Sequence, residues 1–98
     1  MIAERASERL APMPEISRFY GIVISMYAGD HPPPHFHASY AGAEVKVDIR
    51  TGRVLEGRLG PRASRLIREW AMLRQFELMR AWEQAVEMRA VDRIPPLE

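Results

Sequence analysis

Residues 35–49 constrain the fold of this chain more than any other part of the sequence. Apolar and polar side chains alternate strictly in residues 35–40 and again in residues 43–49, with Ala41 and Gly42 between the two runs. Alternation with a period of two is typical of β-strands, because successive side chains point to opposite faces of a sheet. Two such runs joined by a two-residue turn predict an antiparallel hairpin with one apolar and one polar face.

The separation of the two faces fixes the register of this hairpin. A slip by one residue would move every apolar side chain to the polar face, so only one pairing keeps the faces distinct. On the apolar face, this pairing sets Phe36 opposite Val47 and Ala38 opposite Val45. On the polar face, it sets His35 opposite Asp48, His37 opposite Lys46 and Ser39 opposite Glu44.

A second turn is expected at residues 50–52. A three-residue loop with Gly52 in the left-handed conformation, a type I turn with a bulge, keeps apolar residues opposite apolar ones. This loop pairs Val47 with Leu55 and Lys46 with Glu56. We therefore expect a further strand over residues 53–59, with Gly57 as a kink.

The remaining elements follow from changes in the apolar pattern. Residues 19–27 form a nearly unbroken apolar run rich in β-branched side chains, which predicts one buried strand. After Pro61 the apolar period becomes that of a helix. Trp70 and Trp82 lie about 120° apart on a helical wheel, so one straight helix cannot bury both. Two helices are therefore expected, with both tryptophans in the core.

The predicted fold class is α+β. It has a four-stranded antiparallel sheet followed by two C-terminal helices, and the strands cover residues 19–27, 35–40, 43–49 and 53–59 and the helices residues 61–73 and 75–89. A chain of 98 residues suffices for one domain, which we assign to residues 13–98. Residues 1–12 lack an apolar stripe, so we expect them to form an N-terminal extension outside the domain. This extension is either ordered or disordered.

The composition excludes several classes of protein. The sequence has no cysteine, so it has no disulfide, no thiolate nucleophile and no zinc–thiolate site. No apolar run approaches the roughly 18–20 residues of a membrane-spanning helix, and the first residues lack the pattern of a secretion signal. We therefore expect a cytoplasmic protein with no membrane partner. A net charge of +1 provides no strong global attraction to nucleic acid.

The polar face of the hairpin carries the residues best suited to chemistry. His35 and His37 are two positions apart on one strand, about 7 Å along it. Asp48 is expected opposite His35, where its carboxylate could fix the tautomer of the ring, and Lys46 is expected opposite His37. Two imidazoles with unlike neighbours suit the acid–base cleavage of RNA, with His35, His37 and Asp48 as candidate catalytic residues. The plainer alternative is a half-solvated polar face.

The same histidines also suit a metal site. His35 and His37 would supply nitrogen ligands, and His31, Asp30 or Asp48 would supply a further ligand. The His-x-His spacing occurs in zinc and iron sites, but two histidines alone are a weak signal. The sequence is therefore compatible both with a protein that has no cofactor and with one that binds a divalent metal.

Arginines gather in the second half of the sequence. Three of them are spaced three apart on the expected solvent side of the first helix, namely Arg62, Arg65 and Arg68. Three more precede them, namely Arg50, Arg53 and Arg58. Together they could form a basic patch for RNA, DNA or an acidic partner. Glu56 and Glu69 dilute this charge, and an ordinary solvated helix face is the alternative.

Four segments of the chain resemble a known family. They read Met-Pro-Glu-Ile-Ser-Arg-Phe-Tyr-Gly-Ile at residues 13–22, Asp-His-x-Pro-Pro-His-Phe-His at 30–37, Val-Leu-Glu-Gly-x-Leu at 54–59 and Glu-Trp-Ala at 69–71. In these segments the chain resembles the bacterial family of unknown function DUF 4160. The resemblance implies a small stand-alone cytoplasmic protein whose gene often lies beside that of another small protein, as in toxin–antitoxin pairs. It implies no established activity and no established catalytic residues.

Three functions are therefore compatible with the sequence, and whether the protein is an enzyme stays open. The first is a partner-binding component of a toxin–antitoxin-like pair, with a small protein from a neighbouring gene as its partner. The second is a small ribonuclease or a metal-binding hydrolase that uses His35 and His37. The third is a nucleic-acid-binding regulator that uses the arginine-rich surface.

Overall fold

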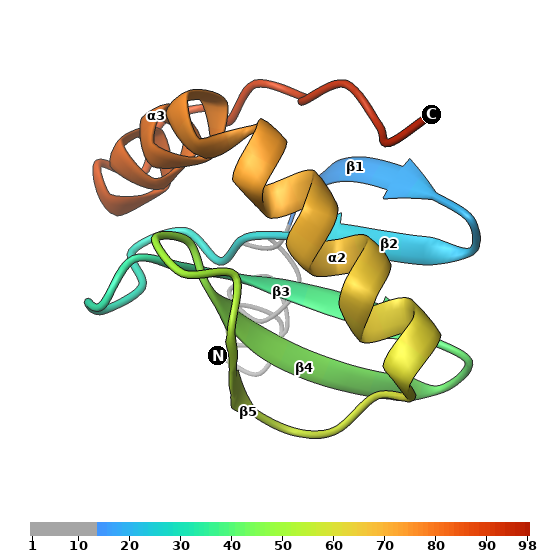
Figure 1. Ribbon diagram of the computed structural model, residues 1–98. Helices are drawn as coiled ribbons and strands as arrows, with labels where there is room; N and C mark the ends of the chain where they lie inside the picture. The colour runs from blue at the N-terminus through green and yellow to red at the C-terminus, as the bar shows by residue number, and fades with distance from the viewer. Residues whose placement is uncertain (1–13) are drawn as a thin grey trace, which may run out of the picture.

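The computed structural model describes residues 14–98 and has a five-stranded antiparallel sheet with two helices (Figure 1). The elements in chain order are β1 (Glu15–Phe19), β2 (Ile22–Ser25), β3 (His35–Tyr40), β4 (Ala43–Asp48), β5 (Val54–Glu56), α2 (Pro61–Leu73) and α3 (Gln75–Val86). The strands lie side by side in sequence order. The predicted α+β class is confirmed, but the prediction of four strands is wrong. The extension expected over residues 1–12 lies outside the described residues.

The error in strand number comes from residues 19–27, which do not form one strand. Tyr20 and Gly21 have φ angles of 50° and 79°, so the chain reverses there and Phe19 pairs with Ile22. Two consecutive left-handed residues are the conformation of a type I′ hairpin turn, whose twist matches that of the flanking strands. Because the residues on both sides of the turn are apolar, hydrophobicity alone did not reveal it.

The β3–β4 hairpin has the predicted register. His35 pairs with Asp48, His37 with Lys46 and Phe36 with Val47, and the remaining predicted pairs are also present. The turn is again a pair of left-handed residues, with φ angles of 51° at Ala41 and 84° at Gly42. Strict alternation was therefore sufficient to predict this register.

The β4–β5 pairing agrees with the prediction at one end only. Lys46 pairs with Glu56 as expected, and Gly52 has a left-handed φ of 73°. Val47, however, pairs with Val54 rather than Leu55, because the bulge lies inside the strand pair. The strand ends at Glu56 rather than at residue 59. Gly57, with a φ of 88°, approaches the backbone oxygen of Glu44 so closely that any Cβ there would collide with it.

Helix α2 has its predicted bounds, whereas α3 ends three residues before the predicted residue 89. The backbone N–H of Met88 donates to the Ala85 carbonyl, and that of Arg89 donates to the Gln84 carbonyl. These two bonds, with Met88 at a φ of 61°, form a Schellman motif, which ends a helix. Among residues 14–98, no helix has both the length and the hydrophobicity to span a membrane.

The core lies between the sheet and α2, which crosses one face of the sheet (Figure 1). Trp70 is fully buried as predicted, and its ring packs against the rings of Phe19 and Phe36. Its indole N–H donates to the Pro95 carbonyl, so the C-terminal tail closes over the same core. Trp82 of α3 is also buried, but on the other side of β3, against the ring of His35.

The segment between β2 and β3 is tied to α3. The backbone N–H of Gly29 donates to the Ala85 carbonyl over 2.7 Å, at the C-terminal end of α3. At the other end of the segment, the N–H of Ile49 donates to the Pro34 carbonyl over 3.1 Å. These two bonds hold the segment against the start of β3 and thereby place Asp30 over that strand.

Candidate metal centre

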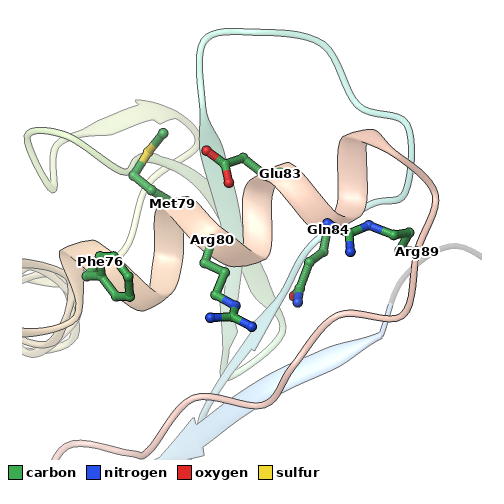
Figure 2. Close-up of a pocket in the computed structure, with 6 residues that line it drawn as sticks. All are labelled: Phe76, Met79, Arg80, Glu83, Gln84 and Arg89. Carbon is green, nitrogen blue, oxygen red and sulfur yellow. The ribbon is translucent and has the colours of Figure 1, made fainter.

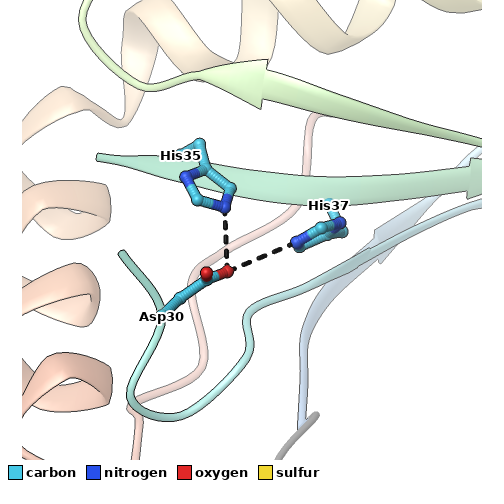
Figure 3. Close-up of side chains that lie close together, drawn as sticks. All are labelled: Asp30, His35 and His37. Carbon is cyan, nitrogen blue, oxygen red and sulfur yellow. Dashed lines mark hydrogen bonds and ion pairs between the residues drawn. The ribbon is translucent and has the colours of Figure 1, made fainter. Parts of the chain in front are cut away.

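Three side chains converge where the β2–β3 segment meets β3 (Figure 3). The Oδ2 atom of Asp30 lies 2.8 Å from Nε2 of His35 and 3.6 Å from Nε2 of His37. The three potential ligand atoms all lie within 4.8 Å of one another. The sequence expectation that the two histidines share one face of β3 is therefore confirmed, and the acidic residue that joins them is Asp30.

His35 is far more buried than a residue on an open polar face. Its side chain is only 2% exposed, because α3 covers the start of β3 and places Trp82 against the imidazole, with 5.1 Å between ring centroids. Its Nδ1 atom lies 2.6 Å from the Pro33 carbonyl oxygen. A carbonyl only accepts, so Nδ1 carries a hydrogen and donates it. The other nitrogen, Nε2, faces Asp30.

His37 is oriented in the same way by a different acceptor. Its Nδ1 atom lies 3.1 Å from the carboxylate of Glu44, which likewise can only accept when ionised. Nε2 therefore carries the lone pair and points toward Asp30, at a distance too long for a good hydrogen bond. This atom is buried and has no hydrogen-bond partner among residues 14–98.

Asp30 is held as a carboxylate by its surroundings. Burial alone would raise its pKa, but the backbone N–H of His31 and the nearby imidazoles of His35 and His37 outweigh burial, and the pKa lies below its usual value. Its Oδ1 atom accepts the His31 N–H over 2.8 Å, which leaves Oδ2 for the histidines. Asp30 is therefore ionised at neutral pH and suited to a cation.

A phenol forms one wall of the cluster. The ring of Tyr27 packs edge-on against His37, with 4.4 Å between centroids. Burial, and then the negative charges of Glu44 and Asp30, raise the pKa of Tyr27 above its usual value. The phenol is therefore neutral at physiological pH and available as a hydrogen-bond donor beside the carboxylates.

Other predicted site residues lie apart from this cluster. His31, a predicted metal ligand, has an exposed side chain. Asp48 pairs with His35 in the sheet, but its carboxylate accepts the backbone N–H groups of Arg50 and Thr51 in the following turn. Lys46 pairs with Glu56, with 3.4 Å between Nζ and the carboxylate. The three helix arginines are exposed on α2, and they are Arg62, Arg65 and Arg68.

Two contributors, Tyr27 and Glu44, were not predicted. A signal for Glu44 existed in the register, because it pairs with Ser39 and so lies diagonally across from His37. Diagonal neighbours in a sheet are within reach of long side chains. Tyr27 belonged to the run assigned to a single strand, and once β2 ends at Ser25 the sequence has no feature that places its ring.

A family model for a domain of unknown function, DUF4160, matches residues 21–83. This match covers more than half of the chain, so the chain belongs to that family. No curated protein and no solved structure matches the chain.

Proposed function

We propose that this DUF4160 protein binds a divalent first-row transition metal through Asp30, His35 and His37. One observation carries the proposal: both imidazoles donate Nδ1–H to an oxygen acceptor, and both Nε2 atoms then face the same carboxylate oxygen. Histidines that bind metals generally donate their other ring N–H to a carbonyl or carboxylate, which fixes the tautomer and the ring orientation. Pro33 and Glu44 provide these two acceptors.

The distances support the same conclusion. Nitrogen and oxygen ligands lie about 2.0–2.2 Å from zinc, so two ligands of one tetrahedral ion are about 3.4 Å apart. The separations of 2.8 and 3.6 Å from Oδ2 to the two Nε2 atoms fall on either side of this value. Small adjustments of the side chains would therefore suffice to bind an ion.

A metal-free hydrogen-bonded cluster is the main competing explanation. A proton between Asp30 and His35 would account for their 2.8 Å contact. It would leave Nε2 of His37 buried without a partner, at a cost of about 1–3 kcal/mol. A cation would use the lone pairs of both histidines and the carboxylate at once, which favours the metal.

Three protein ligands leave a coordination position for water, as in catalytic zinc sites, where bound water ionises near pH 7. If the protein is an enzyme, the open position therefore favours a metal-dependent hydrolase. Metal-independent RNA cleavage is less well supported, because His35 is buried and both of its ring nitrogens already have partners. Imidazole and carboxylate ligands suit zinc and also iron(II).

The test is a titration of chelator-treated protein with zinc, followed by calorimetry and by the melting temperature. We expect one zinc ion per chain, with a rise in melting temperature because binding stabilises only the folded state. His37→Ala should weaken zinc binding by more than the factor of about 10–100 that is typical for loss of a residue that only orients a ligand. His31→Ala is the matched control, because His31 is an exposed histidine of the same segment. Zinc binding that is absent in the wild type, or equally weakened by both substitutions, would refute the proposal.

A partner-binding role in a toxin–antitoxin-like pair is a second proposal, and one surface favours it. A shallow hollow of about 350 Å³ lies on the outer side of α3, with Phe76, Met79 and Arg80 among its lining residues (Figure 2). Phe76 is 77% exposed, and Leu73 at the end of α2, three residues earlier, is 64% exposed. Exposed apolar surface often marks a protein interface.

The partner proposal is tested by co-expression with the small protein of the neighbouring gene. We expect the two proteins to co-purify, and expression of one alone to change growth in a way that the other reverses. Phe76→Ser should abolish co-purification, whereas Glu83→Ser, at the same hollow, should preserve it. Separate elution of the wild-type proteins would end this proposal.

A further inference from the structure

The arginines and the lysine within residues 14–98 form two groups, those with a carboxylate partner and those without one. Arg18, Lys46, Arg74, Arg80, Arg89 and Arg93 each form an ion pair. The six arginines between residues 50 and 68 form no ion pair among residues 14–98, and all six are exposed. We call these six residues the arginine strip, and they are Arg50, Arg53, Arg58, Arg62, Arg65 and Arg68.

The backbone that carries the strip passes through neighbouring elements. It runs from the β4–β5 turn along the edge strand β5 and then into α2 (Figure 1). The middle of α2 touches the turn, because a Cβ added to Gly52 would lie 2.9 Å from Cγ of Arg68. Both ends of the strip therefore belong to one surface.

The local charge of this surface differs from that of the whole chain. Residues 50–69 contain six arginines and two acidic residues, Glu69 and Glu56, and the carboxylate of Glu56 is 3.4 Å from Nζ of Lys46. Their net charge is +4, so the rest of a chain of net charge +1 carries −3. A near-neutral protein thus presents one strongly positive surface, which attracts polyanions.

We propose that the arginine strip binds the phosphate backbone of double-stranded DNA. Guanidinium groups bind phosphate with two parallel hydrogen bonds, and arginines without carboxylate partners are free to do so. Arg62 to Arg68 span about 9 Å of helix, at 1.5 Å per residue. Duplex DNA carries one charge per about 1.7 Å of its axis, so several phosphates lie within reach of this row.

The chemistry of the strip favours a duplex over the other polyanions. Residues 50–68 contain no aromatic side chain on which an unpaired base could stack, and such stacking is the usual basis of single-strand binding. An acidic protein would need an apolar anchor at the centre of the contact. Val54 and Leu55 are about 40% exposed on β5, between Arg53 and Arg58, but no large apolar side chain between residues 58 and 68 is exposed, so the α2 part of the strip lacks such an anchor.

The test is fluorescence anisotropy with a labelled duplex DNA of about 20 base pairs, at salt concentrations from about 50 to 200 mM. We expect the wild type to bind the duplex with an affinity that falls steeply with salt. The triple variant Arg62→Gln, Arg65→Gln and Arg68→Gln should bind at least about tenfold more weakly and lower the salt slope by about one per arginine lost.

The matched control removes the same charge elsewhere. Arg18→Gln, Arg80→Gln and Arg89→Gln replace three exposed, ion-paired arginines and should leave binding within about twofold of the wild type. Equal loss in both triple variants, no wild-type binding at low salt, or tighter binding of a single strand or of polyglutamate than of the duplex would each overturn the proposal. The salt slope of the wild type tests it independently of any variant.

Discussion

At its first two residues, strand β3 is buried on both faces, but by different means. On one face, the ring of Phe36 is fully buried and packs against Trp70 of α2. On the other, His35 is almost as buried and packs against Trp82 of α3, while its two ring nitrogens have hydrogen-bond partners. One strand can therefore hold an apolar core on one side and a polar centre on the other, provided that every buried polar atom finds a partner.

The largest effect is expected on the apolar face. Phe36→Ala should lower the free energy of unfolding by about 3–5 kcal/mol, because it removes a buried aromatic ring and leaves a cavity beside Trp70. Denaturant unfolding followed by tryptophan fluorescence measures this change. A loss below about 1 kcal/mol would show that the two faces do not differ as described.

A smaller decrease in the free energy of unfolding is expected for His35→Ala. The substitution removes a buried ring from Trp82 and leaves the Pro33 carbonyl without its donor, which together should cost about 2–3 kcal/mol. The same unfolding experiment measures it. His35→Ala without loss of stability would mean that the ring is not part of a packed core.

His37→Ala should change the free energy of unfolding by less than about 1 kcal/mol, while it removes a metal ligand. Its contact with the Tyr27 ring and its bond to the exposed carboxylate of Glu44 are lost, but its side chain is partly exposed and its Nε2 atom has no hydrogen-bond partner among residues 14–98, so the net loss is small. Measuring the free energy of unfolding and the zinc affinity on the same preparation separates a structural role of His37 from a role in metal binding. A loss as large as that of His35→Ala would assign His37 to structure rather than to binding.

The smallest effect is a change in acid sensitivity. Because the pKa of Asp30 is lowered in the folded protein, its ionised form contributes stability above the unfolded value of about 3.9, and this contribution is lost as the pH falls through the folded pKa. Asp30→Asn should therefore reduce the loss of stability on acidification below about pH 4. Melting temperatures of both proteins between about pH 6 and 2.5 provide the measurement. Parallel curves would show that Asp30 has no favourable charge interactions in the fold.

The same strand shows how far the sequence alone could predict the structure. Alternation was sufficient for the β3–β4 register and for the shared face of His35 and His37. It could not predict the burial of His35, because Trp82 comes from a helix distant in sequence. Nor could it decide between Asp30 and Asp48 as the carboxylate partner, since pairing of Cα atoms does not fix where a side chain points.

The other errors have equally local causes. The turn at Tyr20 and Gly21 lies inside an apolar run, where no change of hydrophobicity marks it. At the bulge, Val54 and Leu55 are both apolar, so the pattern cannot say which of them faces Val47. The end of α3 depends on Met88, whose left-handed conformation is unusual for a residue other than glycine.

The C-terminal tail has a consequence for self-association. The N–H of Ile94 donates to the carbonyl of Ile16, and the guanidinium of Arg93 donates to that of Glu15, so the tail occupies the outer backbone edge of β1. An unprotected edge of a sheet is a template on which other chains add strands and aggregate. The docked tail blocks such growth at β1. At the opposite edge of the sheet, β5 is only three residues long, which is too short to pair with a long strand of another chain.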